Sequence, residues 1–302
     1  MNFQKDVADW FLFLQDQICT GLEKVDSEGR FVTDSWERPG GGGGTSKIFS
    51  KGKIIERGGV NFSAIHGEAP KILLSQLKNR VKSKTASFFA TGISIVIHPL
   101  IPAIPIIHMN LRYFEMEKIA WFGGGIDLTP HYISKEDAIF FHSEIKSMCE
   151  KYNLSYYHEF KKEADDYFFI KHRNETRGIG GIFFDQLEAN QDISIQDRFN
   201  FVKSTGEFFL PIYTELIRRN KDKEYDEREI QWQRLRRGRY VEFNLVYDRG
   251  TKFGLETMGR TESILMSLPP FAQWEYNYSP EKGSPEELTL QLLKKGIDWA
   301  EL

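Results

Sequence analysis

A stripe of polar residues interrupts the most apolar part of the chain, the sequence SIVIHPLIPAIPIIHMNLRYF at residues 94–114. The stripe consists of Ser94, His98, His108, Asn110 and Arg112. Side chains of equal parity share one face of a strand, so the first two members share a face of one strand and the last three share a face of the next. A solvent-facing polar side is the ordinary alternative, but the Lys and Glu that usually cover exposed strands are absent here. The pattern favours a partly dry cavity that binds an anion.

A second candidate site follows in the sequence WFGGGIDLTP. Gly123 to Gly125 remove side chains from the backbone, which permits close approach by a flat ligand. Asp127 follows in an apolar setting, where it could accept N–H groups or a proton. A turn-forming or helix-capping role is the alternative for this residue. Because its sequence neighbours carry no counter-charge, the sequence predicts that its charged form depends on ligand N–H groups or on Arg112. Replacing it with Asn is then expected to maintain or raise stability.

The composition excludes several classes of protein. The chain has 302 residues and a hydrophobic fraction of 40%, which predicts a globular protein. Its net charge of −3 gives no overall positive field that would attract nucleic acid or anionic membranes. The basic run RLRRGR is preceded by acidic DKEYDERE and is interpreted as a solvated helix end. The N-terminal segment lacks the features of a signal or transit peptide, and no apolar run is long enough for a membrane span. Cys19 and Cys149 are expected as buried free thiols, and the chain as a cytoplasmic protein.

Secondary-structure patterns predict an α+β fold in a single domain spanning 1–302. Strands come early and are joined by short turns, while most helices come later, which favours a large, mostly antiparallel sheet flanked by helices on both faces. Strands are expected at 87–98, at 104–117, before a glycine-rich turn at 123–125, at GIGGIFFDQL and at RYVEFNLVYDRG; helices are expected at 68–80, 134–152, 156–175, 193–238 and 285–300. The five glycines at 40–44 lack the GKS or GKT ending of a phosphate loop and are expected to form a mobile loop.

Several longer strings resemble the oxygen-dependent coproporphyrinogen III oxidase family. They are WERPGGGGGTSKIF, GGVNFSAIHGE, GISIVIHPLIPAIPIIHMNLRYFE, WFGGGIDLTP, DDYFFIKHRNETRGIGGIFFD, RRGRYVEFNLVYDRGTKFGLETMGRTESILMSLPP and WEYNY with GSPEE. They occur in the family's order, from about Asp34 to near the end. The resemblance implies an antiparallel sheet between helical layers, and a homodimer through a dimerisation segment at 240–275. It also implies oxidative decarboxylation of two propionates of coproporphyrinogen III to vinyl groups, giving protoporphyrinogen IX in haem biosynthesis.

The resemblance also implies roles for particular residues. Substrate contacts are expected from Ser94, Asn110, Leu111, Arg112, Met258, Gly259 and Arg260. Arg112 and Arg260 are the natural propionate partners, because a guanidinium fork matches a carboxylate. For residue 258 only a backbone contact is carried over, because Met stands where related chains often have a different residue. Asp127 would gather the pyrrole N–H groups, and His108 would donate a proton.

A divalent metal, perhaps Mn, is a further expectation from the resemblance. Its ligands would be His98, His108, His142 and His172, although their spacing matches no compact metal motif. No organic cofactor is expected, and O2 would be the co-substrate. Two other classes stay open. One is a mononuclear iron oxygenase that uses His98, His108 and Asp127, and the other is a carrier that binds a tetrapyrrole without reaction.

Overall fold

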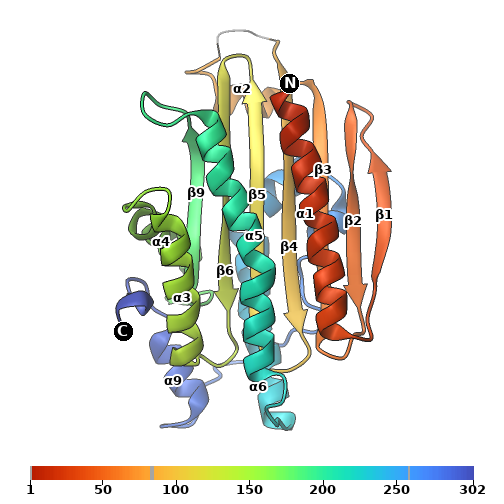
Figure 1. The fold of residues 1–302 in the computed structure, drawn as a ribbon. Helices are drawn as coiled ribbons and strands as arrows, with labels where there is room; N and C mark the ends of the chain where they lie inside the picture. Colours follow the sequence, from red (N-terminus) through yellow and green to blue (C-terminus); the bar gives the residue numbers. More distant parts are fainter. Residues whose placement is uncertain (1, 82–84, 258) are drawn as a thin grey trace.

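The protein folds as one seven-stranded antiparallel sheet between two layers of helices (Figure 1). The computed structural model describes residues 2–81, 85–257 and 259–302. The strand order is β1-β2-β3-β4-β5-β6-β9, and β7 and β8 form a separate two-stranded ribbon. The strands are β1 (Phe31–Glu37), β2 (Gly42–Ser50), β3 (Ile55–Glu68), β4 (Ser87–Pro99), β5 (Ile106–Met116), β6 (Ile119–Thr129), β7 (Phe169–Ile170), β8 (Glu175–Thr176) and β9 (Gly180–Glu188). The α+β class and the antiparallel sheet are confirmed.

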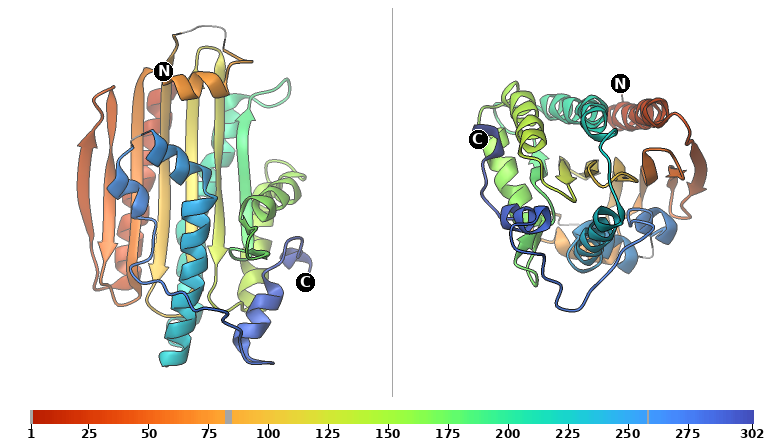
Figure 2. Two further views of the ribbon diagram at one scale, coloured as in Figure 1. Left: turned by 180° about the vertical axis from the view of Figure 1, so that it is seen from behind. Right: turned by 90° about the horizontal axis from the view of Figure 1, so that it is seen from below.

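The helices divide between the two faces of the sheet (Figures 1 and 2). On one face lie α1 and α5, with α3 and α4 beside them toward β9; α6, α7 and α8 lie on the opposite face. The helices are α1 (Phe3–Asp26), α2 (Lys71–Gln76), α3 (Lys135–Glu150), α4 (Tyr156–Tyr167), α5 (Ile195–Asn220), α6 (Glu227–Val246), α7 (Arg249–Glu256), α8 (Thr261–Leu265) and α9 (Pro285–Leu292), with a 3-10 turn at Trp299–Glu301. Within the described residues, no helix is long and apolar enough to cross a membrane.

The main core lies between the sheet and the α1–α5 layer. In α1, apolar residues recur at helical spacing, and Val7, Phe11 and Ile18 are buried. In β5, the odd-numbered residues Ile107 to Tyr113 face this layer and are at most 2% exposed. The even-numbered residues of β5 therefore face α6 and α8, which is the side that carries the polar stripe.

Several predicted elements are confirmed with small changes of boundary. Residues 87–98 and 104–117 form the paired strands β4 and β5, and GIGGIFFDQL forms β9. The helix α3 begins after Ser134, whose side chain accepts a hydrogen bond from the Asp137 amide, as expected for an N-cap. The region 193–238 contains α5 and most of α6, separated by a short connection.

Other expectations are wrong. RYVEFNLVYDRG is helical rather than a strand, because Tyr240, Phe243 and Asn244 are buried at a spacing of three and four residues. The glycines 123–125 lie inside β6 instead of in a turn, and Gly42 to Gly44 belong to β2 instead of to a loop. The helix predicted at 156–175 ends at Tyr167, before the ribbon of β7 and β8.

Two predictions about individual side chains have opposite outcomes. Cys19 and Cys149 are buried free thiols, as predicted, and burial raises the pKa of each to about 12. The run RLRRGR is not a solvated helix end. Arg236 and Arg237 are buried in α6, where Arg236 pairs with Glu175 and Arg237 pairs with Glu56.

Candidate active site

The predicted polar stripe occupies one face of three neighbouring strands. Antiparallel pairing sets Ser94 on β4 opposite Asn110 on β5, and His108 on β5 opposite Asp127 on β6. Arg112 follows on the same face, and its Nη1 donates a hydrogen bond to Oδ1 of Asn110 at 3.2 Å. His108, Asn110 and Arg112 share one face of β5, as strand parity predicts. That the three side chains line one cavity stays a prediction.

His108 and Asp127 form a hydrogen-bonded pair on this face. His108 Nδ1 lies 2.7 Å from Asp127 Oδ1. The His108 side chain is 21% exposed, whereas Asp127 is 1% exposed. An ionised carboxylate only accepts hydrogen bonds, so Nδ1 carries the proton and donates it. In the described parts of the chain nothing hydrogen-bonds to Nε2, so this nitrogen is available to exchange a proton with a ligand.

Arg177 supplies the counter-charge of Asp127. Its Nη2 donates to both carboxylate oxygens, at 2.9 and 2.7 Å, and its Nη1 donates to Asn244 Oδ1 at 2.9 Å. Burial alone would raise the pKa of Asp127, but the charge of Arg177 and the hydrogen bonds from His108 and Arg177 outweigh it and hold the pKa below its ordinary value. The prediction that ligand groups or Arg112 would stabilise this charge is wrong, because Arg177 lies 50 residues away in sequence and adjacent in space.

Aromatic rings enclose the guanidinium of Arg177. Its central carbon lies 4.4 Å from the ring centroid of Phe168 and 4.7 Å from those of Tyr240 and Phe243. Cation–π contacts of this kind gain strength when water is excluded. Asp127 therefore lies at the buried end of a dry cluster and reaches the open face only through His108. In this geometry Asp127 can position the imidazole. That it gathers pyrrole N–H groups stays a prediction.

The two arginines predicted to bind propionates each pair with an aspartate. Arg112 Nη2 lies 2.7 Å from Oδ1 of Asp185, which lies in β9 where the pairing with β6 is irregular. Arg260, at the start of α8, forms an ion pair with Asp34 on β1. Both guanidinium groups are partly exposed, at 35% and 30% of the side chain. They are thus accessible to a carboxylate ligand.

The remaining predicted substrate residues differ in their placement. Ser94 lies on the polar face, opposite Asn110. Gly259 precedes α8, and its amide donates a hydrogen bond to the Gly254 carbonyl in α7. The side chain of Leu111 is fully buried on the opposite face, in the core with α1 and α5. A contact between Leu111 and a ligand beside His108 stays a prediction and would have to use the backbone. Met258 lies outside the described residues.

The four histidines predicted to bind a metal have separate partners. His98 Nε2 donates to the Ser267 carbonyl, and His172 bonds to Tyr247 and Glu242. His142 bonds to Tyr157 and to the Ile179 carbonyl, while Nδ1 of His108 is taken by Asp127. Among the described residues, no three His, Cys, Asp or Glu side chains converge as metal ligands would. The four-histidine site and the triad of His98, His108 and Asp127 therefore do not fit this arrangement.

Arg177 and Asn61 also belong to this face and were not predicted as site residues, although the sequence carries a signal for each. Arg177 is a cation within the apolar, glycine-rich TRGIGGIFF, where an unpaired charge would be costly. Asn61 alternates with apolar residues in β3 and lies opposite Ser94. Its Nδ2 donates to the Ser263 carbonyl at 2.8 Å, while its buried Oδ1 has no partner among the described residues. Asn61 thus presents an acceptor beside the predicted substrate residues.

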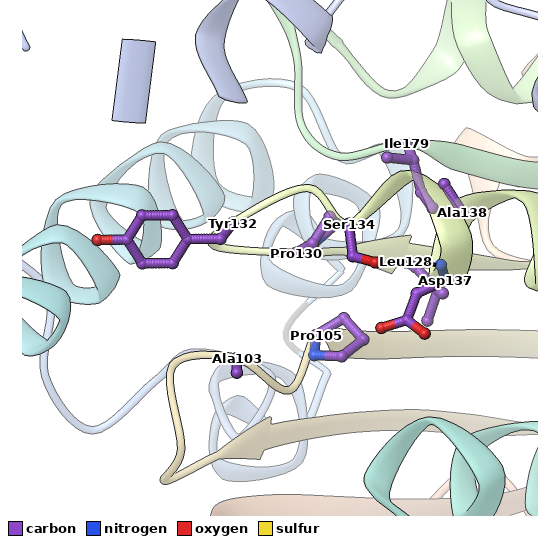
Figure 3. A pocket seen from close by; sticks show the side chains of 9 residues that line it. All are labelled: Ala103, Pro105, Leu128, Pro130, Tyr132, Ser134, Asp137, Ala138 and Ile179. Carbon is purple, nitrogen blue, oxygen red and sulfur yellow. Dashed lines mark hydrogen bonds between the residues drawn. The ribbon is translucent and has the colours of Figure 1, made fainter. Parts of the chain in front are cut away.

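A small pocket lies away from this face, at the end of β6 near the start of α3 (Figure 3). It is lined by Ala103, Pro105, Leu128, Pro130, Tyr132, Ser134, Asp137, Ala138 and Ile179. Leu128 alternates with Asp127 and therefore faces the opposite side of the sheet. With about 10 Å³ of space, the pocket is large enough for one water molecule and too small for a macrocycle.

Comparisons with known proteins identify the family of this chain. The sequence profile of the family described as "Coproporphyrinogen III oxidase" matches residues 6–299. A relative from Prochlorococcus marinus (strain NATL1A), named oxygen-dependent coproporphyrinogen-III oxidase, is 48% identical over 95% of this chain and 88% of its own length. A relative of the same name from Drosophila melanogaster is 49% identical over 95% of this chain and 75% of its own length. The chain belongs to the coproporphyrinogen III oxidase family.

Proposed function

We propose that this chain catalyses the O2-dependent oxidative decarboxylation of two propionates of coproporphyrinogen III to vinyl groups, in haem biosynthesis. Family membership supports the reaction class. The observation in the structure that carries the proposal is the His108–Asp127 pair on the same sheet face as Asn110 and Arg112. A proton-exchanging group beside an anion-binding group matches a substrate that carries both pyrrole N–H groups and carboxylates.

His108 is the proton-exchanging residue in this proposal. Asp127 keeps the proton on Nδ1, so Nε2 faces the ligand as an acceptor and, once protonated, as a donor. A pyrrole that loses its N–H proton becomes a stronger reductant of O2. Asp127 and Arg177 hold the imidazole in this orientation from the buried end of the same face.

Arg112 and Arg260 bind propionates, since their forks match carboxylates. Each reacting propionate loses CO2 and two electrons and becomes a vinyl group. The electrons reduce O2, and one propionate, one O2 and one proton balance as one vinyl group, one CO2 and one H2O2. O2 is thus the co-substrate, and we propose that no organic cofactor takes part, because the macrocycle itself supplies the electrons.

A turnover assay tests the proposal. Purified protein is incubated with coproporphyrinogen III in air and under anaerobic conditions, each with and without a chelator, and vinyl products are measured. We expect product in air and none without O2. Binding of the macrocycle without product in air would instead support a tetrapyrrole carrier. Conversion that depends strictly on added iron and on an organic co-substrate would support an iron oxygenase.

We also propose a homodimer that forms through residues 240–275, and a cytoplasmic setting. Among the described residues of this segment, six large apolar side chains are 38–59% exposed: Leu245, Val246, Phe253, Leu255, Phe271 and Trp274. Exposed apolar groups gathered in one segment suit contact with a second copy. The two buried free thiols suit a reducing compartment. Sedimentation of the wild type and of Val246→Asp tests the dimer; a monomeric wild type would contradict it.

A further inference from the structure

The two arginines of the polar face are already paired with carboxylates of the chain itself. Arg112 contacts Asp185 and Arg260 contacts Asp34. The aspartate side chains are 29% and 46% exposed, so neither pair is sealed from solvent. A ligand propionate and a resident aspartate would thus compete for the same guanidinium group.

The Arg112–Asp185 contact leaves much of the guanidinium fork free. A single hydrogen bond joins Nη2 to Oδ1, and Nη1 donates to Asn110. Asp185 Oδ1 also accepts from the Gln186 amide at 3.0 Å. By contrast, Arg173 binds Glu242 through two parallel bonds at 2.9 and 2.7 Å, which is the fork geometry of a firm pair.

The fold provides space for this weakly joined pair. A Cβ atom on Gly123, which pairs with Arg112 across β5 and β6, would lie 2.8 Å from both Arg112 Nη2 and Asp185 Oδ1. Any side chain at this position would therefore displace the pair. The glycine opening that the sequence suggested for a flat ligand is occupied by these two charged groups when the face is empty.

The reaction explains why a resident carboxylate is useful. Decarboxylation destroys the anion that an arginine binds, so the cation would lose its counter-charge each time CO2 leaves. An aspartate within reach restores neutrality, and it also weakens the hold on the substrate. We propose that Asp185 and Asp34 are exchangeable counter-ions, which pair with Arg112 and Arg260 in the empty and product-bound enzyme and release them to substrate carboxylates. This inference rests on the proposed function.

Binding of coproporphyrin III, the unreactive oxidised tetracarboxylate, tests the exchange in Asp185→Asn. Removal of the competing charge is expected to tighten binding by about two- to five-fold, as measured by quenching of porphyrin fluorescence. KM for coproporphyrinogen III should fall as well, because the substrate carboxylate no longer has to displace a resident anion. Asp185→Glu keeps the charge and should restore the wild-type Kd. A merely structural aspartate would give the opposite sign, since its loss would disorder Arg112 and weaken binding.

Asp192→Asn is the matched control. Asp192 is exposed in the connection between β9 and α5, and its loss changes the net charge equally. Its Kd should equal that of the wild type. Unchanged or weaker binding in Asp185→Asn overturns the proposal at that pair. Asp34→Asn tests the second pair independently, and melting temperatures establish that each variant is folded. Absence of wild-type turnover would reject the proposed function separately, because the binding measurements need no reaction.

Discussion

Two arginine–aspartate pairs lie on the same face of the sheet and differ mainly in burial. In Arg177–Asp127 both side chains are 2% exposed, and one guanidinium nitrogen reaches both carboxylate oxygens. In Arg112–Asp185 the side chains are 35% and 29% exposed, and one hydrogen bond joins them. The charges are equal, but the surroundings are different.

Burial decides what each pair can do. Separating charges in a dry cluster leaves an uncompensated ion, so Arg177 and Asp127 stay together while the protein is folded. An exposed pair gains little from its own attraction, since water solvates both partners after separation. The first pair can therefore hold His108 in place, and the second can exchange its carboxylate for that of a ligand.

The largest expected effect comes from breaking the buried pair. Arg177→Met keeps much of the side-chain volume but leaves Asp127 without its counter-charge. We expect the free energy of unfolding to fall by about 3–5 kcal/mol, as measured by urea titration. Arg112→Met is the control and should change stability by less than about 1 kcal/mol. Equal losses in the two variants would show that burial does not separate the pairs.

The next effect is a loss of turnover in Asp127→Asn. The amide cannot stabilise a protonated imidazole or fix its tautomer as the carboxylate does, so kcat should fall by at least about a hundredfold. Binding of coproporphyrin III should change little, because Arg112 and Arg260 are intact. The shape of the pH–rate profile should also change, because a neutral amide replaces the charged partner of the imidazole. Turnover near the wild-type rate would contradict the role of Asp127.

The same variant reverses an expectation from sequence. Without a visible counter-charge, loss of the carboxylate was expected to maintain or raise stability. Because Arg177 compensates Asp127, its loss leaves a buried guanidinium unpaired, and we expect a lower melting temperature. A higher melting temperature than that of the wild type would mean that the pair costs more than it contributes.

Acid should remove the stability that the Asp127 charge contributes. The pKa of Asp127 is below its ordinary value, so its contribution to stability is complete above about pH 4 and is lost as the pH falls through the folded-state pKa. The unfolding free energy of the wild type should therefore fall more steeply below about pH 4 than that of Asp127→Asn. Parallel curves for the two proteins would contradict a stabilising Asp127 charge.

The sequence predicted the parts of the site that depend on local geometry. Strand parity was sufficient to group His108, Asn110 and Arg112, because alternation is a property of the backbone. Helical spacing was ambiguous at YVEFNLV, where apolar residues fit both a strand and one side of α6. Arg177 could not be matched to Asp127, since their contact depends on how β6, β9 and α6 pack together. Local patterns identify faces, and tertiary packing selects partners.

The smallest expected effect, a double-mutant cycle, compares the pairs most directly. Arg112→Ala, Asp185→Ala and the double variant are unfolded in urea, and the coupling energy is the part of the double effect that the single changes do not explain. For a half-exposed pair with one hydrogen bond we expect about 0.2–1 kcal/mol. The parallel cycle on Arg177 and Asp127 should give a coupling energy several-fold larger, because each single change there leaves a buried charge.

A coupling energy above about 2 kcal/mol for Arg112 and Asp185 would mean that this pair does not separate readily. A propionate could not then displace Asp185 readily, and its role would be to orient Arg112 permanently. A small coupling, together with tighter porphyrin binding in Asp185→Asn, leaves exchange as the account that fits both measurements.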